Sequence, residues 1–425
     1  MVDRKQNISD QGLSQISHTQ GRLFVFSLLG CFFAYPLSSY ISDFLGIESN
    51  LLSITARAVA LILVLYYFGF LLLHNLFRPV PAFYLFVLFW LIYIVRIFHD
   101  TLQYGWMLGR PPSDYYLFAL LLSFFCSFPF YVPVVIPFRF LEKMAWGILI
   151  LLNVLGAWNI FTADVLFLER VGGNEKMNPI LFGMLAALLV AFSVVRVLRS
   201  GSALSMKIFN LAAVMLGFFN LVASASKSPV LFLLTTLFGL IFFHSKMGNR
   251  KSLFLLLGVL GAGIGAIFFY GLQDMLLLLL SRFTEITDDD SSRERWDMLS
   301  GGFIQFLNEP IFGSFLEEKI HKEYPHNLVV ESFMATGMAG GTIFILYYFM
   351  AIRSAARILL STGFGFISLT ALSVLILSMF SGGLAFSVDF WICMAATFAL
   401  AYQSSHSLEH IGQKPIASSL GASPV

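Results

Sequence analysis

The chain has 425 residues, of which 58% are hydrophobic, 16% are aromatic and only 12% are charged. A soluble globular protein carries about 25% charged residues, so this composition excludes a water-exposed surface over most of the molecule. The formal net charge is +2 and the sequence contains no basic run, so we expect no nucleic acid partner.

Long apolar segments follow one another along the chain. A helix needs about 20 apolar residues to cross the hydrocarbon core of a bilayer. Runs near that length occur at residues 23–44, 54–73, 80–98, 115–136, 144–163, 179–198, 206–224, 229–244, 252–275, 328–352, 362–380 and 384–402. They predict an all-α, polytopic membrane helix bundle with about 12 transmembrane helices. Eleven or thirteen helices are also possible, because the run at 229–244 is short and the run at 115–136 contains Pro129.

The distribution of Lys and Arg predicts the orientation of these helices. Outside the long segment 276–327, most of these residues fall on the same side as the N-terminus. Cytoplasmic loops are enriched in Lys and Arg, so both termini are predicted to be cytoplasmic. The chain then divides into helices one to nine (1–275), a large extracytoplasmic loop (276–327), helices ten to twelve (328–402) and a cytoplasmic tail (403–425).

The large loop contains a predicted amphipathic helix from Ser292 to Asn308, which Pro310 ends. Apolar residues recur in it at helical spacing and form one stripe: Trp296, Leu299, Phe303, Phe306 and Leu307. Such a helix fits either a membrane interface or a lid over the bundle.

Cations on the extracytoplasmic side go against the usual charge bias, so each needs a reason. Outside the loop they are Arg57, Arg96, Arg110, Arg170, Lys176 and Lys227, and the loop adds Arg293 and Arg295 among others. One reason is an anionic ligand, because guanidinium groups match phosphate oxygens. The other is a snorkelling or ion-paired side chain, and Arg96 with the nearby Asp100 is a plausible pair.

His326 lies in Tyr324-Pro325-His326-Asn327, immediately before the apolar run that opens with Leu328 and includes Glu331. The N-terminus of a helix disfavours an imidazolium and keeps the ring neutral. A neutral imidazole there could accept a proton from a hydroxyl, although a histidine at a helix start is often structural. A general base and a pyrophosphate-binding cluster in one loop would suit glycosyl transfer from a lipid diphosphate.

Several short motifs, in this order, resemble the O-antigen ligase and polymerase superfamily. They are Asn178-Pro179-Ile180, Ser226-Lys227-Ser228-Pro229, Arg293-Glu294-Arg295-Trp296, Glu309-Pro310-Ile311-Phe312-Gly313, Pro325-His326-Asn327 and Thr336-Gly337-Met338-Ala339-Gly340. The resemblance spans about 165–345, with Lys227 standing where the superfamily usually has Arg.

The resemblance implies a glycosyltransferase of the inner membrane that needs no metal or other cofactor. Its donor would be an undecaprenyl-diphosphate-linked glycan, and its acceptor a hydroxyl of lipid A–core or of another glycan at the periplasmic face. His326 would be the catalytic base. Arg295, Arg293, Lys227 and Arg170 would bind the diphosphate, with Asn327 and Glu331 supporting the site.

Three functions remain open at this point. A ligase moves a finished glycan onto a terminal acceptor, whereas an O-antigen or exopolysaccharide polymerase moves a growing chain onto the next lipid-linked repeat. The His-Asn pair in one dominant loop favours the ligase by family analogy. A transporter of lipid-linked sugars is less favoured, because it should carry charges deep in several helices.

Overall fold

The computed structural model describes residues 2–46, 49–162, 172–173, 177–198, 203–246, 258, 261, 277, 290–362 and 365–412. The described residues are mostly helical and contain no strand beyond one isolated bridge between Glu318 and Glu323. The helices are α1 (Val2–Leu45), α2 (Ser49–Leu73), α3 (Ala82–Tyr104), α4 (Pro112–Asp114), α5 (Phe138–Thr162), α6 (Pro179–Leu198), α7 (Leu204–Ser224), α8 (Lys227–Lys246), α11 (Asp290–Asn308), α12 (Leu328–Thr362), α13 (Phe366–Leu377) and α14 (Val388–Gly412). The prediction of an all-α polytopic bundle is confirmed.

Eleven of the twelve predicted runs coincide with helical segments, and the run at 252–275 lies outside the described residues except for residues 258 and 261. Eight described helices are long and apolar enough to cross a membrane, while Lys227–Gly239 and Phe366–Leu377 are shorter apolar stretches. The fourth run is a π-helix at Tyr115–Phe124 followed by a 3₁₀-helix at Phe125–Tyr131, which contains Pro129. Helix α1 also begins earlier than its apolar run, at Val2.

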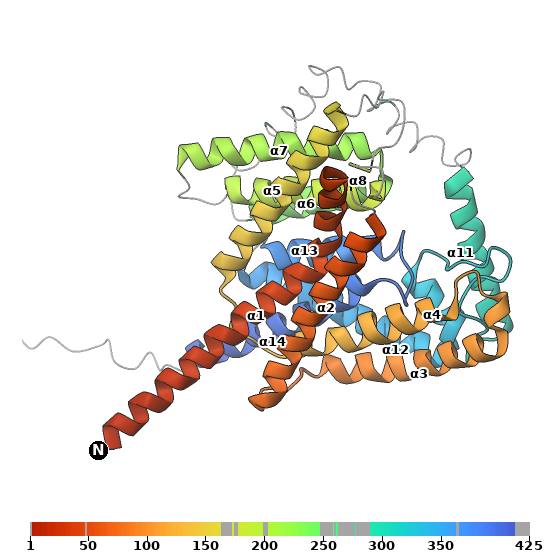
Figure 1. Cartoon of the computed structure of the whole chain (residues 1–425), viewed down its shortest axis with the longest axis horizontal. Helices are drawn as coiled ribbons and strands as arrows, with labels where there is room; N and C mark the ends of the chain where they lie inside the picture. The colour runs from red at the N-terminus through yellow and green to blue at the C-terminus, as the bar shows by residue number, and fades with distance from the viewer. Residues whose placement is uncertain are drawn as a thin grey trace, which may run out of the picture.

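Two groups of helices make up the bundle (Figure 1). Helix α6 is apolar on all sides and almost entirely buried between α5, α7 and α8, as expected for a helix with no polar face. In the second group, α3 and α12 lie side by side, and α11 runs across their right-hand ends in the view shown. The loop segment predicted to carry the chemistry therefore lies at one end of α3 and α12.

Aromatic side chains join α3, α12 and α14. The Trp391 ring lies 5.2 Å from the ring of Trp90 and 5.8 Å from that of Phe89, measured between ring centres, and Phe344 contacts both Phe89 and Trp391. All four residues are buried. Aromatic pairs at these separations add to the energy of area burial, so α3 and α12 form a firm base for the residues at their ends.

Helix α12 is interrupted at Gly337, which has φ 61° and ψ −159°. The break exposes backbone groups that pair with the turn after α11: Met338 N–H donates to Pro310 O at 2.7 Å, and Ser314 N–H donates to Met334 O at 2.8 Å. A Cβ atom at Gly337 would overlap the backbone of Ile311. The Pro310–Gly313 turn and the Gly337 segment, two of the predicted motifs, thus form one backbone-to-backbone contact.

Replacing Gly337 by alanine should destabilise the protein by at least about 2 kcal/mol, because the substitution adds left-handed strain to a backbone clash. The measurement is the midpoint of thermal unfolding of the purified protein in detergent. Gly147→Ala is the matched control, since a Cβ there meets open space within α5. Equal midpoints for the two variants would contradict the close contact.

Candidate functional site

The turn that carries His326 is fixed by its neighbour Asn327, the N-cap of α12. The Asn327 side-chain oxygen accepts hydrogen bonds from the N–H groups of Val329 at 3.1 Å and Val330 at 3.0 Å. This is the capping pattern that asparagine favours. His326 itself has φ 55°, a left-handed conformation that histidine and asparagine adopt more readily than most residues. The imidazole is therefore presented by a tight, capped turn at the start of α12.

Three consecutive carbonyls of the α13–α14 connection hold this turn in place. Ser378 O accepts from Leu328 N–H at 3.0 Å, and Met379 O accepts from the Asn327 amide at 3.2 Å. Phe380 O accepts from the Arg295 guanidinium at 3.3 Å. Residues 378–380 thus tie the His-Asn turn to the predicted phosphate-binding arginine of α11. Sequence reasoning missed this segment, and only its Gly382-Gly383 pair could have drawn attention to it.

The predicted supporting residue Glu331 binds the backbone of the same α13–α14 connection. It is 2% exposed, and its carboxylate accepts the Leu384 N–H at 2.9 and 3.0 Å and the Tyr93 hydroxyl at 3.4 Å. A buried carboxylate is stable only with such partners. Glu331 therefore positions the α13–α14 connection from the first turn of α12, the helix that follows the His326 turn.

Two arginines act electrostatically on the His326 ring. They are Arg295, from α11, and Arg110, from the connection between α3 and α4. The Arg110 guanidinium carbon lies 5.4 Å from the centre of the Tyr324 ring, which in turn meets the His326 ring edge-on at 4.7 Å. The sequence singled out Arg110 only as one of several unexplained cations.

The other predicted phosphate-binding residues are placed less directly. Arg293 is an exposed residue of α11, and Lys227 is a half-buried residue at the start of α8. Arg170 lies outside the described residues. The charges that act on His326 within the described part of the chain do not include Lys227. The substrate contacts of all three residues stay predictions.

The His326 environment keeps the imidazole neutral. Burial lowers the pKa of His326 to about 4, and the positive charges of Arg295 and Arg110 contribute to the shift. Nδ1 is buried and has no hydrogen-bond partner among the described residues. A neutral ring has one nitrogen able to accept a proton, so the geometry is suited to a general base.

The pH profile of the reaction should reflect this pKa. A base works in its neutral form, so activity should hold from about pH 8 down to about pH 5.5 and fall only as the pH approaches 4, well below the usual histidine value near 6.5. Arg295→Gln should move this acidic limb upward, because it removes a charge that disfavours the imidazolium. An acidic limb near pH 6.5 in the unaltered protein would contradict the lowered pKa of His326.

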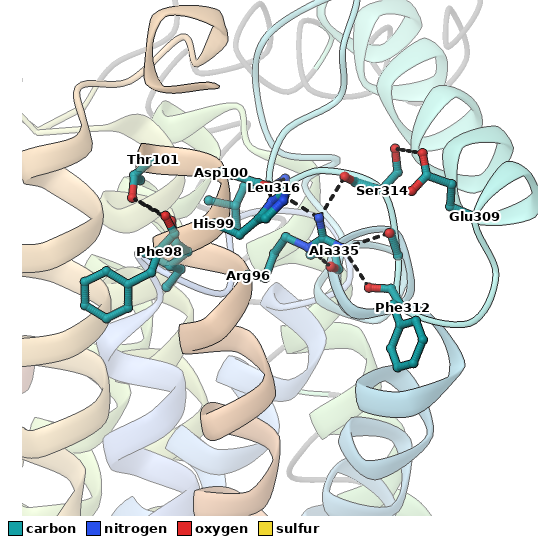
Figure 2. Close-up of polar contacts among 12 residues, drawn as sticks. Arg96, Phe98, His99, Asp100, Thr101, Glu309, Phe312, Ser314, Leu316 and Ala335 are labelled. Atoms are coloured by element: carbon teal, nitrogen blue, oxygen red, sulfur yellow. Dashed lines mark hydrogen bonds and ion pairs between the residues drawn. The ribbon is translucent and has the colours of Figure 1, made fainter. Parts of the chain in front are cut away.

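Arg96 organises the backbone of the segment after α11 (Figure 2). Its guanidinium donates to Ala335 O at 2.9 Å and Ser314 O at 3.0 Å, and to Phe312 O and Gly313 O at 2.8 Å each. The predicted pair with Asp100 is present at 3.3 Å. This cation is fully used in holding the Pro310–Gly313 turn against the Gly337 break, so it serves the architecture of the site.

Two buried carboxylates complete this anchoring. Asp100 also accepts the Leu316 N–H at 2.9 Å. Glu317 accepts the Tyr115 hydroxyl and the Gly109 N–H, both at 2.6 Å. Together they bind the segment after α11 to α3 and to the π-helix.

Part of the predicted apolar stripe of α11 packs against α12, and part of it is exposed. Phe306 packs on Phe333 of α12, at 5.1 Å between ring centres. Trp296, Phe303 and Leu307 are exposed, at 66%, 52% and 58%. The helix observed, Asp290–Asn308, covers the predicted one, but its packed side also uses Met298 and Gln305.

An apolar cavity of about 370 Å³ lies in the bundle and reaches this region. Helices α1, α2, α6 and α13 contribute to its wall, as does Arg57, whose guanidinium lies 5.0 Å from the centre of the Tyr35 ring. Phe386 lines the cavity and also contacts Arg110 at 4.8 Å. A cavity of about 150 Å³ beneath the α13–α14 connection shares Phe386 and Asp389 with it. The cavities and the His326 turn therefore have a common wall.

Residues 211–345 match the family model described as O-Antigen ligase. This part of the chain is similar to the O-antigen ligase superfamily. The match confirms the resemblance predicted from the motifs and supports a ligase- or polymerase-like membrane glycosyltransferase. No curated protein matches the chain.

The O-antigen ligase segment contains Lys227, Arg293, Arg295, His326 and Glu331. Arg110 and the carbonyls of residues 378–380 lie outside it, although the structure brings them to the same turn. No group of three or more His, Cys, Asp or Glu side chains able to hold a metal occurs among the residues that the structure describes. Within the described part of the chain, the site combines the His326 imidazole with the charges of Arg295 and Arg110 that act on it.

Proposed function

We propose that this protein transfers a glycan from undecaprenyl diphosphate to an acceptor hydroxyl at the periplasmic face of the inner membrane, with both termini cytoplasmic. The observation that carries the proposal is the half-buried imidazole of His326, whose Nδ1 has no partner among the described residues and on which the charges of Arg295 and Arg110 act. Glycosyl transfer from a diphosphate needs only a base and fixed positive charge.

In the proposed reaction His326 removes the proton of the acceptor hydroxyl as its oxygen attacks the anomeric carbon of the donor. The bond from that carbon to the diphosphate oxygen breaks, and the electron pair leaves with the diphosphate. Fixed cations stabilise the charge that develops on the leaving group. We assign this role to Arg295 first, with Arg293, Lys227 and Arg170 as further candidates, and the proton on His326 passes to solvent as the products leave.

The apolar cavity gives room for part of the donor's hydrocarbon chain. Its volume of about 370 Å³ is within the usual range of roughly 300–1,000 Å³ for ligand pockets, which are mostly apolar with a few polar groups. Because Phe386 belongs to both the cavity wall and the surroundings of Arg110, a chain in the cavity would bring its diphosphate toward His326.

The test is transfer by the purified protein in vesicles that contain the lipid-linked repeat. A product that forms only when lipid A–core is added supports the ligase, which the family resemblance favours. Longer lipid-linked chains formed from the repeat alone support a polymerase using the same site. No new glycosidic bond under either condition would overturn the proposal.

Lys227 provides a test of the diphosphate contact. If its charge is needed, Lys227→Arg should retain most transfer activity, whereas Lys227→Ala should lose roughly tenfold or more, the size of a lost charge-assisted hydrogen bond. The readout is kcat/KM for the lipid-linked donor in vesicles. Equal activities of the two variants would remove Lys227 from the site.

A further inference from the structure

Arg110 is a cation of the site that the motifs do not identify. It follows Gly109, whose N–H is held by the Glu317 carboxylate at 2.6 Å, and it precedes Pro111-Pro112. Because proline fixes its own φ and restricts the residue before it, this short connection is stiff. The backbone therefore presents the Arg110 side chain in a defined direction.

The guanidinium lies among the residues of the His326 turn. It lies over the rings of Phe386 at 4.8 Å and Tyr324 at 5.4 Å, and its charge acts on the His326 imidazole. Two aromatic faces hold a planar guanidinium without using its N–H donors. The group is thus oriented by stacking and can still exchange hydrogen-bond partners.

Its present partner is Glu323, which accepts from Nη2 at 2.9 Å and from Nε at 3.3 Å. The two side chains are 36% and 32% exposed. Ion pairs with this much access to water contribute little to stability. Arg96 shows the contrast, since its side chain is 14% exposed and occupied by four carbonyls and Asp100.

The geometry points to Arg110 as a further ligand of the donor's diphosphate, with Glu323 as the carboxylate that it leaves when the donor binds. A diphosphate offers the fork of the guanidinium the same paired oxygens as a carboxylate, with more charge. The inference rests on the proposed function, because it assumes a lipid diphosphate at this site. It assigns to Glu323 a competing role that the motifs do not suggest.

The alternative is a static pair that only holds the Tyr324 turn. The two roles predict opposite signs for one substitution. If Glu323 competes with the diphosphate, Glu323→Gln frees Arg110 and strengthens binding. If the pair is a structural brace, the same substitution loosens the turn and weakens binding. The backbone bond from Glu318 N–H to Glu323 O survives in either case.

The experiment measures the affinity of the full-length protein in detergent for farnesyl diphosphate, a short lipid diphosphate. We expect Glu323→Gln to tighten binding at least about threefold and Arg110→Gln to weaken it at least about tenfold. The affinity of the double variant should match that of Arg110→Gln. The affinity of Arg110→Lys should lie between those of the unaltered protein and Arg110→Gln, because a point charge replaces the guanidinium fork. Lys319→Gln is the matched control, as it removes one positive charge from an exposed side chain of the same loop.

Weaker or unchanged binding in Glu323→Gln would overturn the inference, as would an Arg110→Gln effect no larger than that of Lys319→Gln. Failure of the proposed function would appear differently, as the absence of farnesyl diphosphate binding in the unaltered protein. A parallel steady-state assay adds a second check. Arg110→Gln should raise KM for the donor, and Glu323→Gln should lower it.

Discussion

Replacing His326 should reduce glycan transfer by about 10²- to 10⁴-fold, the usual contribution of a positioned general base, while the protein still inserts in the membrane. Among the described residues, His326 is the histidine on whose ring the positive charges of both Arg295 and Arg110 act. Without it, the acceptor hydroxyl must lose its proton to water. The measurement is kcat for transfer from the lipid-linked donor in vesicles.

The substitution must remove the imidazole of His326 without disturbing the turn that carries it. His326→Asn removes the imidazole but suits the φ of 55° at this position, since asparagine is enriched in left-handed conformations. His326→Ala removes the ring as well but adds strain to the turn. His321→Ala is the control, because this exposed histidine of the same loop pairs with Glu318 at 2.7 Å. Transfer at the normal rate by both His326 variants would exclude the base role.

The helices of this protein could be predicted because the apolar pattern of each segment by itself specifies a helix. An apolar run of the right length specifies a membrane helix whatever its neighbours are, and eleven runs coincide with helical segments. The π-helix at Tyr115–Phe124 could not be predicted this way. It differs from an α-helix in its backbone hydrogen bonds, which the apolar pattern does not encode.

The site was predictable where its parts are close in sequence and not where they are distant. His326 and Asn327 adjoin the run that starts at Leu328, so the capped turn follows from local rules. The carbonyls of residues 378 and 379 meet that turn from about 50 residues away, and Arg110 meets it from more than 200 residues away. Such contacts depend on the tertiary packing of α3, α12 and the α13–α14 connection.

Arg96 illustrates a second reason why sequence alone was insufficient. The sequence predicted its pairing with Asp100, one helical turn away, and this pair is present. The four carbonyls that it also binds belong to residues 312–314 and 335. Its main role is therefore to hold the turn after α11 against the break in α12. This role cannot be predicted from either motif by itself, because it depends on the contact between the two.

Arg96→Met should destabilise the protein by roughly 3–5 kcal/mol, as expected when one partner of a buried ion pair is removed. The Asp100 side chain is 0% exposed and would keep only its contacts with His99 and Leu316. The carbonyls of residues 312–314 and 335 would lose their donor as well, and an unpaired buried acceptor has its own cost. The stability of Arg96→Lys should lie between those of the unaltered protein and Arg96→Met, because a lysine ammonium group has three donors but lacks the planar fork of a guanidinium.

The measurement is the midpoint of thermal unfolding in detergent, with Arg353→Met as the control. Arg353 is an exposed residue of α12, and surface changes of this kind stay within about 0.5 kcal/mol. Since the turn and the Gly337 break support the segment that leads to His326, Arg96→Lys should also lower kcat more than it raises KM. If Arg96→Met unfolds with the same midpoint as Arg353→Met, the four carbonyl contacts do not hold the loop, and the positioning of His326 must depend on residues 378–380 alone.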